Sequence, residues 1–286
     1  MVEVLITLAI ASFILLLSGQ FIASTSAYQG RQEITLPVQE SMRGAMEVMT
    51  TELREAMTPR IISSYSTPPA ALAAYASSNT AVTIIGGSDS RSFALTKPTG
   101  YPATVGYVAL NAVNVDSPNA QGATCQSVLT ASDYFLLLSQ PVGSTSLGIS
   151  WGQVAPTGCV GGLIPSISAM PAVGQWTVDA RVLEATITQY SLGTVNGVKV
   201  LSRRVIAGTG AGTSQVVAFD ITNMTVEYSV DGNTFTATPS GTAEPLAVRI
   251  TLTGQTDQTR IGVSSTQPYT LSQTVFMRQT ALIKNF

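Results

Sequence analysis

The chain has 286 residues, which is enough for one long helix and one sizeable globular domain, or for two small domains. Charged residues make up 10% of it, hydrophobic residues 45%, and the formal net charge is −2; a soluble domain usually has about a quarter of its residues charged. This composition offers no basic patch for nucleic acid, so we expect no nucleic-acid contact. The chain contains no histidine, which excludes Ser-His-Asp and Cys-His catalysis.

The first predicted element is a hydrophobic helix over residues 1–30, and residues 4–30 of it carry no charge. Residues 4–22 have about the length, roughly 20 residues, of a helix that crosses a bilayer. Glu3 stands directly before this segment. An isolated carboxylate there is costly in lipid unless it lies at the interface or meets a partner, although it suits the positive end of the helix dipole. Glu3 is therefore a candidate functional residue, and an interfacial glutamate without a special partner is the plain alternative.

A cleaved signal peptide is the main competing interpretation of this segment, and small residues around positions 23–27 would allow a cleavage site. However, no basic residue precedes Arg31, and helical periodicity continues through residues 31–60. The apolar face of this second half is formed by Met42, Met46, Met49, Leu53 and Met57, and the charged residues Glu40, Arg43, Glu47 and Arg54 lie mostly off it. We therefore expect one helix of about 80 Å, at 1.5 Å per residue.

Residues 61–286 are predicted to form a β-rich globular head. Tandem prolines at 68 and 69 mark an exposed connection after the helix. Runs of β-forming residues follow at 81–85, at 91–96 and from 105 onwards. The apolar run 134–139 has the length of a strand that is buried on both faces. Most of the remainder between residues 120 and 171 is predicted to be loop.

The second half of the head is predicted to contain two hairpins. Asn196-Gly197 lies between two alternating runs, and both residues tolerate the positive φ that a tight hairpin turn needs. Asp231-Gly232 predicts a second hairpin by the same reasoning. The glycine-rich stretch 208–212 lacks the spacing of a nucleotide-binding loop and is predicted to be a hairpin loop. Residues 246–253 alternate, and residues 269–283 supply the last strand or two.

These features together resemble the type IV pilins and pseudopilins, most closely the W-type minor pilins and the J-type pseudopilins. The resemblance rests on the opening MVEVLITLAI, on QESMRGAMEVMTTELREA, and on the order of the later strands. In those strands the matching residues are Arg203 and Arg204, then Tyr228 with Asp231 and Gly232, then Pro245 with Ala247, Val248 and Arg249.

The resemblance implies an α+β pilin-like fold, in which the long helix packs on an antiparallel sheet and extra strands follow the usual sheet. It also implies a precursor whose leader is removed by a prepilin peptidase. The family's acid lies four positions after the first mature residue, whereas Glu3 lies two positions after Met1. We therefore expect the given sequence to begin slightly inside the mature protein, or at an internal methionine.

Two cysteines, Cys125 and Cys159, are too few for a zinc site in a chain without histidine. In an exported protein the pair predicts a disulfide, and two free buried thiols are the alternative. The chain has no GxSxG, GxxxxGK[ST] or HExxH motif. We accordingly predict neither a catalytic nor a metal residue and no cofactor.

The predicted function is that of a structural subunit in a type IV pilus or pseudopilus, held in the bacterial inner membrane by its helix and later placed in a periplasmic or extracellular filament. Its partners would be other pilin subunits, which its helix contacts, and Glu3 would meet the amino terminus of a neighbour. The large head favours a minor subunit that primes assembly. A major repeating subunit and a membrane-anchored surface adhesin are the alternatives.

Overall fold

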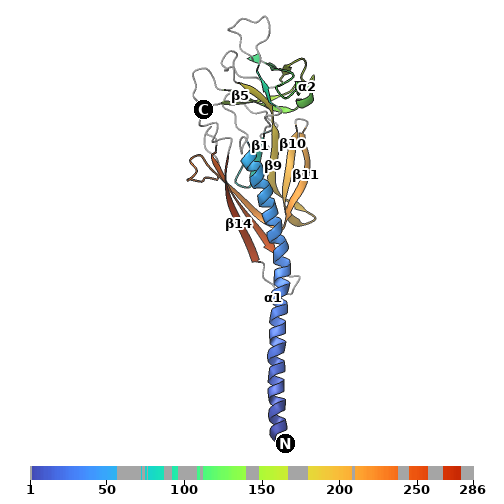
Figure 1. The fold of residues 1–286 in the computed structure, drawn as a ribbon, viewed down its shortest axis with the longest axis vertical. Coiled ribbons are helices and arrows are strands. Elements are labelled where there is room, and N and C mark those ends of the chain that lie inside the picture. The colour runs from blue at the N-terminus through green and yellow to red at the C-terminus, as the bar shows by residue number, and fades with distance from the viewer. Residues whose placement is uncertain are drawn as a thin grey trace.

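The computed structural model describes residues 2–56, 72, 75, 77–86, 92–95, 108–109, 112–139, 148–166, 180–207, 210–237, 245–256 and 267–277. It shows one long helix followed by antiparallel sheets, which is an α+β arrangement. Helix α1 runs from Val2 to Glu55 and projects far beyond the sheets at its amino-terminal end (Figure 1). The predicted long helix is therefore present. Met57 and the two prolines of the predicted connection lie outside the described residues.

Two sheets flank the carboxyl-terminal half of α1 (Figure 1). One has the strand order β1-β9-β10-β11 and the other the order β12-β13-β14. Their strands are β1 (Ala81–Gly86), β9 (Thr186–Val195), β10 (Val198–Ala207), β11 (Gly210–Phe219), β12 (Ile221–Ser229), β13 (Ala247–Thr256) and β14 (Gln267–Phe276). The sheets meet beside β1, where the backbone N–H of Val226 donates to the carbonyl of Asn79, at 2.9 Å. Together with α1 they enclose the main hydrophobic core.

A second set of strands is inserted between β1 and β9, at the end of the molecule remote from the amino terminus (Figure 1). Gly86 and Thr186 are paired, so the chain leaves and re-enters the main sheet at one point. The insert contains the sheets β2-β8-β5-β6 and β3-β4-β7. Its elements are β2 (Ser92–Ala94), β3 (Val108–Ala109), β4 (Ala112–Asn114), α2 (Cys125–Val128), β5 (Tyr134–Ser139), β6 (Gly148–Gln153), β7 (Leu163–Pro165) and β8 (Arg181–Glu184).

Strand β5 explains how the insert is attached to the main sheets. Phe135 and Leu137 face the insert's own core, whereas Tyr134 and Leu136 face a separate core at the junction. That junction core also contains Ile85 of β1, among other residues. Side chains alternate across a strand, so a strand between two cores must be apolar at every position. The prediction that residues 134–139 are buried on both faces is confirmed for 134–137.

The region 120–171 contains α2, β6 and β7 in addition to the predicted strand β5, and most of its other described residues lie outside helices and strands, as expected. Strands β12, β13 and β14 follow the four-stranded sheet, and a further group of strands that the sequence did not indicate is inserted between β1 and β9. The run after Asp231-Gly232 was expected to complete a hairpin. Among the described residues it forms an isolated antiparallel bridge, Tyr228 to Thr236, and the strand that pairs with β12 is β13.

The glycine-rich stretch 208–212 was expected to be a hairpin loop, but its last three residues belong to β11, which begins at Gly210. The Asn196-Gly197 hairpin is confirmed. It connects β9 to β10, with φ of 51° at Asn196 and 82° at Gly197. Those positive values are the reason for this residue pair, because a two-residue hairpin turn of this type needs left-handed backbone at both positions.

Candidate functional site

The most distinctive surface of the protein is the amino-terminal half of α1. Residues Ile6–Ser26 are long and apolar enough to cross a membrane, and none of this window is buried by the rest of the protein. Its largest side chains are strongly exposed, for example Phe13 at 64% and Phe21 at 72%. An exposed apolar surface of this size needs lipid or protein around it. The segment is therefore compatible with a single-pass anchor.

The carboxyl-terminal half of the same helix is held tightly by the sheets. Met42, Met46, Met49 and Leu53 are each at most 2% exposed, as the helical periodicity predicted. Glu40, Arg43, Glu47 and Arg54 are exposed, also as predicted. Below the helix lies Gly254 of β13, where an added Cβ would stand 2.6 Å from Met42 Sδ and 2.9 Å from Val38 Cγ1. A glycine at this position lets the helix approach the sheet closely.

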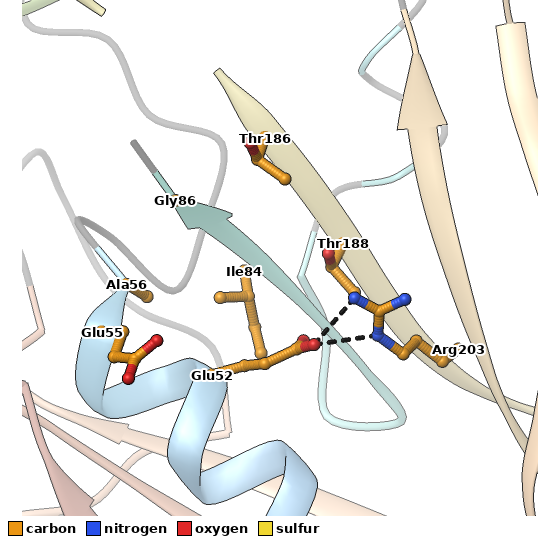
Figure 2. A pocket seen from close by; sticks show the side chains of 8 residues that line it. All are labelled: Glu52, Glu55, Ala56, Ile84, Gly86, Thr186, Thr188 and Arg203. Atoms are coloured by element: carbon orange, nitrogen blue, oxygen red, sulfur yellow. Dashed lines mark hydrogen bonds and ion pairs between the residues drawn. The ribbon is translucent and has the colours of Figure 1, made fainter. Parts of the chain in front are cut away.

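Near the carboxyl-terminal end of α1, a pocket with a volume of about 260 Å³ opens between the helix and the main sheet. Figure 2 shows Glu52 reaching from the helix to Arg203 on β10 across this pocket. Glu52 Oε1 accepts from Arg203 Nε at 2.9 Å and forms an ion pair with Arg203 Nη2 at 2.8 Å. The hydroxyl of Tyr190, on β9, donates to Glu52 Oε2 at 2.9 Å. One carboxylate therefore joins the helix to two neighbouring strands.

Burial determines the protonation states of Tyr190 and Arg203 in this cluster. Tyr190 is fully buried. Burial and then the negative charge of Glu52 raise the pKa of the Tyr190 phenol well above its usual range, so it remains a neutral donor. Burial tends to lower the pKa of Arg203, but the hydrogen bond and the charge of Glu52, together with Tyr190, outweigh this effect and the pKa of Arg203 is raised. Both oxygens of Glu52 are engaged, so the arrangement fastens the helix to the sheet and offers no free acid or base.

The predicted site residues lie far apart along the molecule. Glu3 lies in the first turn of α1, and its side chain is outside the described part of the structure. Cys125 and Cys159 form a disulfide within the core of the insert, and each is less than 5% exposed. The predicted pairing is therefore present, and the alternative of two free thiols is not. Among the described residues no group of three or more His, Cys, Asp or Glu could hold a metal ion.

Sequence reasoning missed Glu52 as a residue that joins helix and sheet. A weak signal was available, because Glu52 stands three residues after Met49 and next to Leu53, at the border of the apolar face. A carboxylate at such a border is close enough to the sheet to meet a cation there. The identity of that cation, Arg203, depends on how β9 and β10 pair, which the local pattern does not specify.

Comparison of the chain with protein-family models, with curated proteins and with solved structures gives no match.

Proposed function

We propose that this protein is a structural subunit of a type IV pilus-like filament or pseudopilus. Its apolar half-helix is held in the inner membrane before assembly and packs among the helices of other subunits in the filament core afterwards. A prepilin peptidase acts on the precursor, and the head faces the periplasm or the cell exterior. The support is the sequence resemblance, together with the way in which the helix is mounted on the head.

The single observation that carries this proposal is the continuity of α1. One helix, Val2–Glu55, has an apolar half exposed along its length and a second half clamped between two sheets. A simple anchor needs no fixed geometry between its membrane segment and its head. A filament does need it, because each head can occupy its position in the lattice only if its helix stands at a set angle. An unbroken helix locked by Glu52 and by close packing at Gly254 meets that need.

Within a filament the subunit would have one of two roles. The large head would crowd a repeated lattice, which favours a minor subunit near the tip. The uncharged edge strands β11 and β14 favour a repeated subunit instead. The number of copies per filament, measured on purified filaments, decides between them. A third candidate, a membrane-anchored adhesin, requires the helix only as an anchor.

The test of the filament role uses Glu3. In a helix core with little water, an unpaired carboxylate costs several kcal/mol, so it must meet a partner, for which the amino terminus of a neighbour is suited. The variant Glu3→Ala should still be made and inserted in the membrane but should join filaments poorly. The measurement is the ratio of sheared-filament to membrane-bound protein. Glu40→Ala, at an exposed acid on the same helix, is the matched control and should assemble like the wild type.

An equal ratio for wild type and Glu3→Ala would show that Glu3 has no pairing role. If no wild-type protein is recovered by shearing while membrane retention and surface display are normal, the adhesin interpretation replaces the filament proposal. A loss in Glu40→Ala as large as that in Glu3→Ala would mean that loss of any negative charge on α1 impairs assembly, and it would remove the special role of Glu3.

A further inference from the structure

Two ten-residue strands, β11 and β14, form the outer edges of the two main sheets. Among the described residues β11 pairs only with β10, and β14 pairs only with β13. Neither strand contains a charged residue. Soluble proteins usually protect a long edge with lysine or other charges, with proline or with a bulge, because its free N–H and C=O groups can pair with another chain. Strand β11 has two register irregularities against β10, and β14 has Pro268 next to its first residue, so residues 214–216 of β11 and residues 269–276 of β14 are the parts without such protection. Two uncharged edges in one protein therefore suggest a pairing partner.

Exposure of the side chains supports this interpretation for β11. Every residue from Gly212 to Val216 is exposed, so this part of the strand is uncovered on both faces. A strand of a stable sheet normally buries at least one face. In β14 the residues Pro268, Tyr269 and Thr270 are likewise exposed on both faces, and Phe276 at the other end is 62% exposed.

The two edges run in opposite directions, which is shown by their contacts with α1. The backbone N–H of Phe219, at the end of β11, donates to Ser41 Oγ on the lower part of the clamped helix. Gln215, four residues earlier in β11, pairs with Arg203, which contacts Glu52 further along the helix, so β11 runs against the direction of α1. Strand β14 begins beside the same lower part of the clamped helix, because Tyr269 and Leu271 line a pocket with Gln39. From there β14 runs in the direction of α1. Figure 1 shows the two strands on opposite sides of the helix.

Copies anchored in one membrane by the same helix stand parallel to one another. When two such copies lie side by side, β11 of one and β14 of the next meet as antiparallel strands, which pair more stably per residue than parallel ones. We propose that β11 of each copy pairs with β14 of its neighbour. The partner is a second copy of this chain, because the edges match in length, in lack of charge and in direction. Such a contact uses two different surfaces and therefore continues from copy to copy.

This inference rests on the proposed filament function and specifies how neighbouring heads meet. The test is cross-linking of the full-length protein in cells with a short flexible bismaleimide. The structure has no free cysteine among its described residues, and maleimides leave the Cys125–Cys159 disulfide intact. One double variant carries Gln215→Cys and Thr270→Cys, and a second carries Thr213→Cys and Thr274→Cys; all four positions are exposed.

Each double variant should give a ladder of multimers on a denaturing gel, because every copy presents one thiol on each edge. Each single variant should give no ladder. The control double variant Thr194→Cys with Thr270→Cys should give none either, since Thr194 lies beside the β9–β10 turn and away from both edges. The ladder is measured in the membrane fraction and in the sheared fraction.

A second measurement places charge on the edge with Ser214→Lys and Val216→Lys, both at exposed positions. The sheared fraction should fall by roughly a factor of ten, which corresponds to about 1.4 kcal/mol of lost interface free energy. Wild-type yield in this variant would overturn the pairing. Sheared filaments without any ladder from either double variant would also overturn it, and would leave the filament function intact. A ladder in membranes without sheared wild-type filaments would support the pairing and contradict the filament function.

Discussion

Removal of the Glu52 carboxylate is the sharpest test of how the helix is mounted. In Glu52→Ala the Tyr190 phenol loses the acceptor to which it donates at 2.9 Å, while it stays fully buried. Leaving a buried donor unsatisfied costs about 1–3 kcal/mol. Arg203 loses its ion pair as well, but its side chain is 26% exposed and water can replace much of that interaction, so this part adds at most about 1 kcal/mol. The expected loss of unfolding free energy is about 1–4 kcal/mol.

The assay is urea unfolding of a fragment that begins at Gln29, and the unfolding is monitored by circular dichroism. Glu52→Gln keeps one acceptor oxygen and should lose only about half as much, near 1 kcal/mol. A double-mutant cycle with Tyr190→Phe should show that the two residues are coupled, because the phenylalanine no longer needs the acceptor.

Glu55→Ala is the matched control, because Glu55 lines the same pocket and forms no ion pair with a described residue. It should change stability by less than about 0.5 kcal/mol. The reasoning fails if Glu52→Ala is as stable as the wild type, or if Glu55→Ala is equally destabilised.

Three further predictions concern other parts of the head. Reduction of the disulfide, or the double substitution Cys125→Ser with Cys159→Ser, should destabilise the insert by about 3–4 kcal/mol, because the bond closes a loop with a sequence separation of 34 residues. Protein that is unfolded without a reducing agent should show no reactive thiol. Gly254→Val should cost about 1–3 kcal/mol by overpacking against α1, whereas Gly193→Val, with no atom nearer than 3.6 Å to its added Cβ, should cost less; urea unfolding compares them. Backbone N–H groups hold the pKa of Asp231 well below its ordinary 3.8. The ionised Asp231 carboxylate therefore stabilises the folded protein above pH 3.8, and this stabilisation is lost as the pH falls further and the carboxylate becomes protonated. The difference in unfolding free energy between the wild type and Asp231→Asn should accordingly become smaller in unfolding experiments at acid pH.

Local patterns in the sequence were sufficient for the elements that depend on local physics. The periodicity of Met42, Met46, Met49 and Leu53 predicted which face of α1 is buried, because a helix repeats every 3.6 residues whatever it packs against. The Asn196-Gly197 turn was predictable for a similar reason, since its backbone conformation restricts the residue type at those two positions. The disulfide was predicted from the presence of two cysteines together with the expectation that the chain is exported.

Strand β6 shows what local patterns could not provide. Its sequence, GISWGQ, is rich in glycine and serine and was predicted to be loop. It forms a strand because β5 offers it a pairing edge, and Gly152 is required there because the ring of Phe135 occupies the space that a Cβ would need. That requirement comes from a side chain on a different strand, and the residue types around Gly152 do not show which side chain will face it.

Spacing and residue type along short stretches were enough to predict one long helix with an apolar and an amphipathic half and an antiparallel β head, and the two cysteines predicted one disulfide. Three features became visible only in the folded chain: Glu52 meets Arg203 and Tyr190, an insert leaves and re-enters the main sheet at Gly86 and Thr186, and β11 and β14 are the uncovered edges. All three depend on which strands pair with which. Glu52 and Arg203 are 151 positions apart, Gly86 and Thr186 are 100 apart, and the edge strands are set by partners outside their own stretch, so the energies of these contacts appear only when the chain is folded.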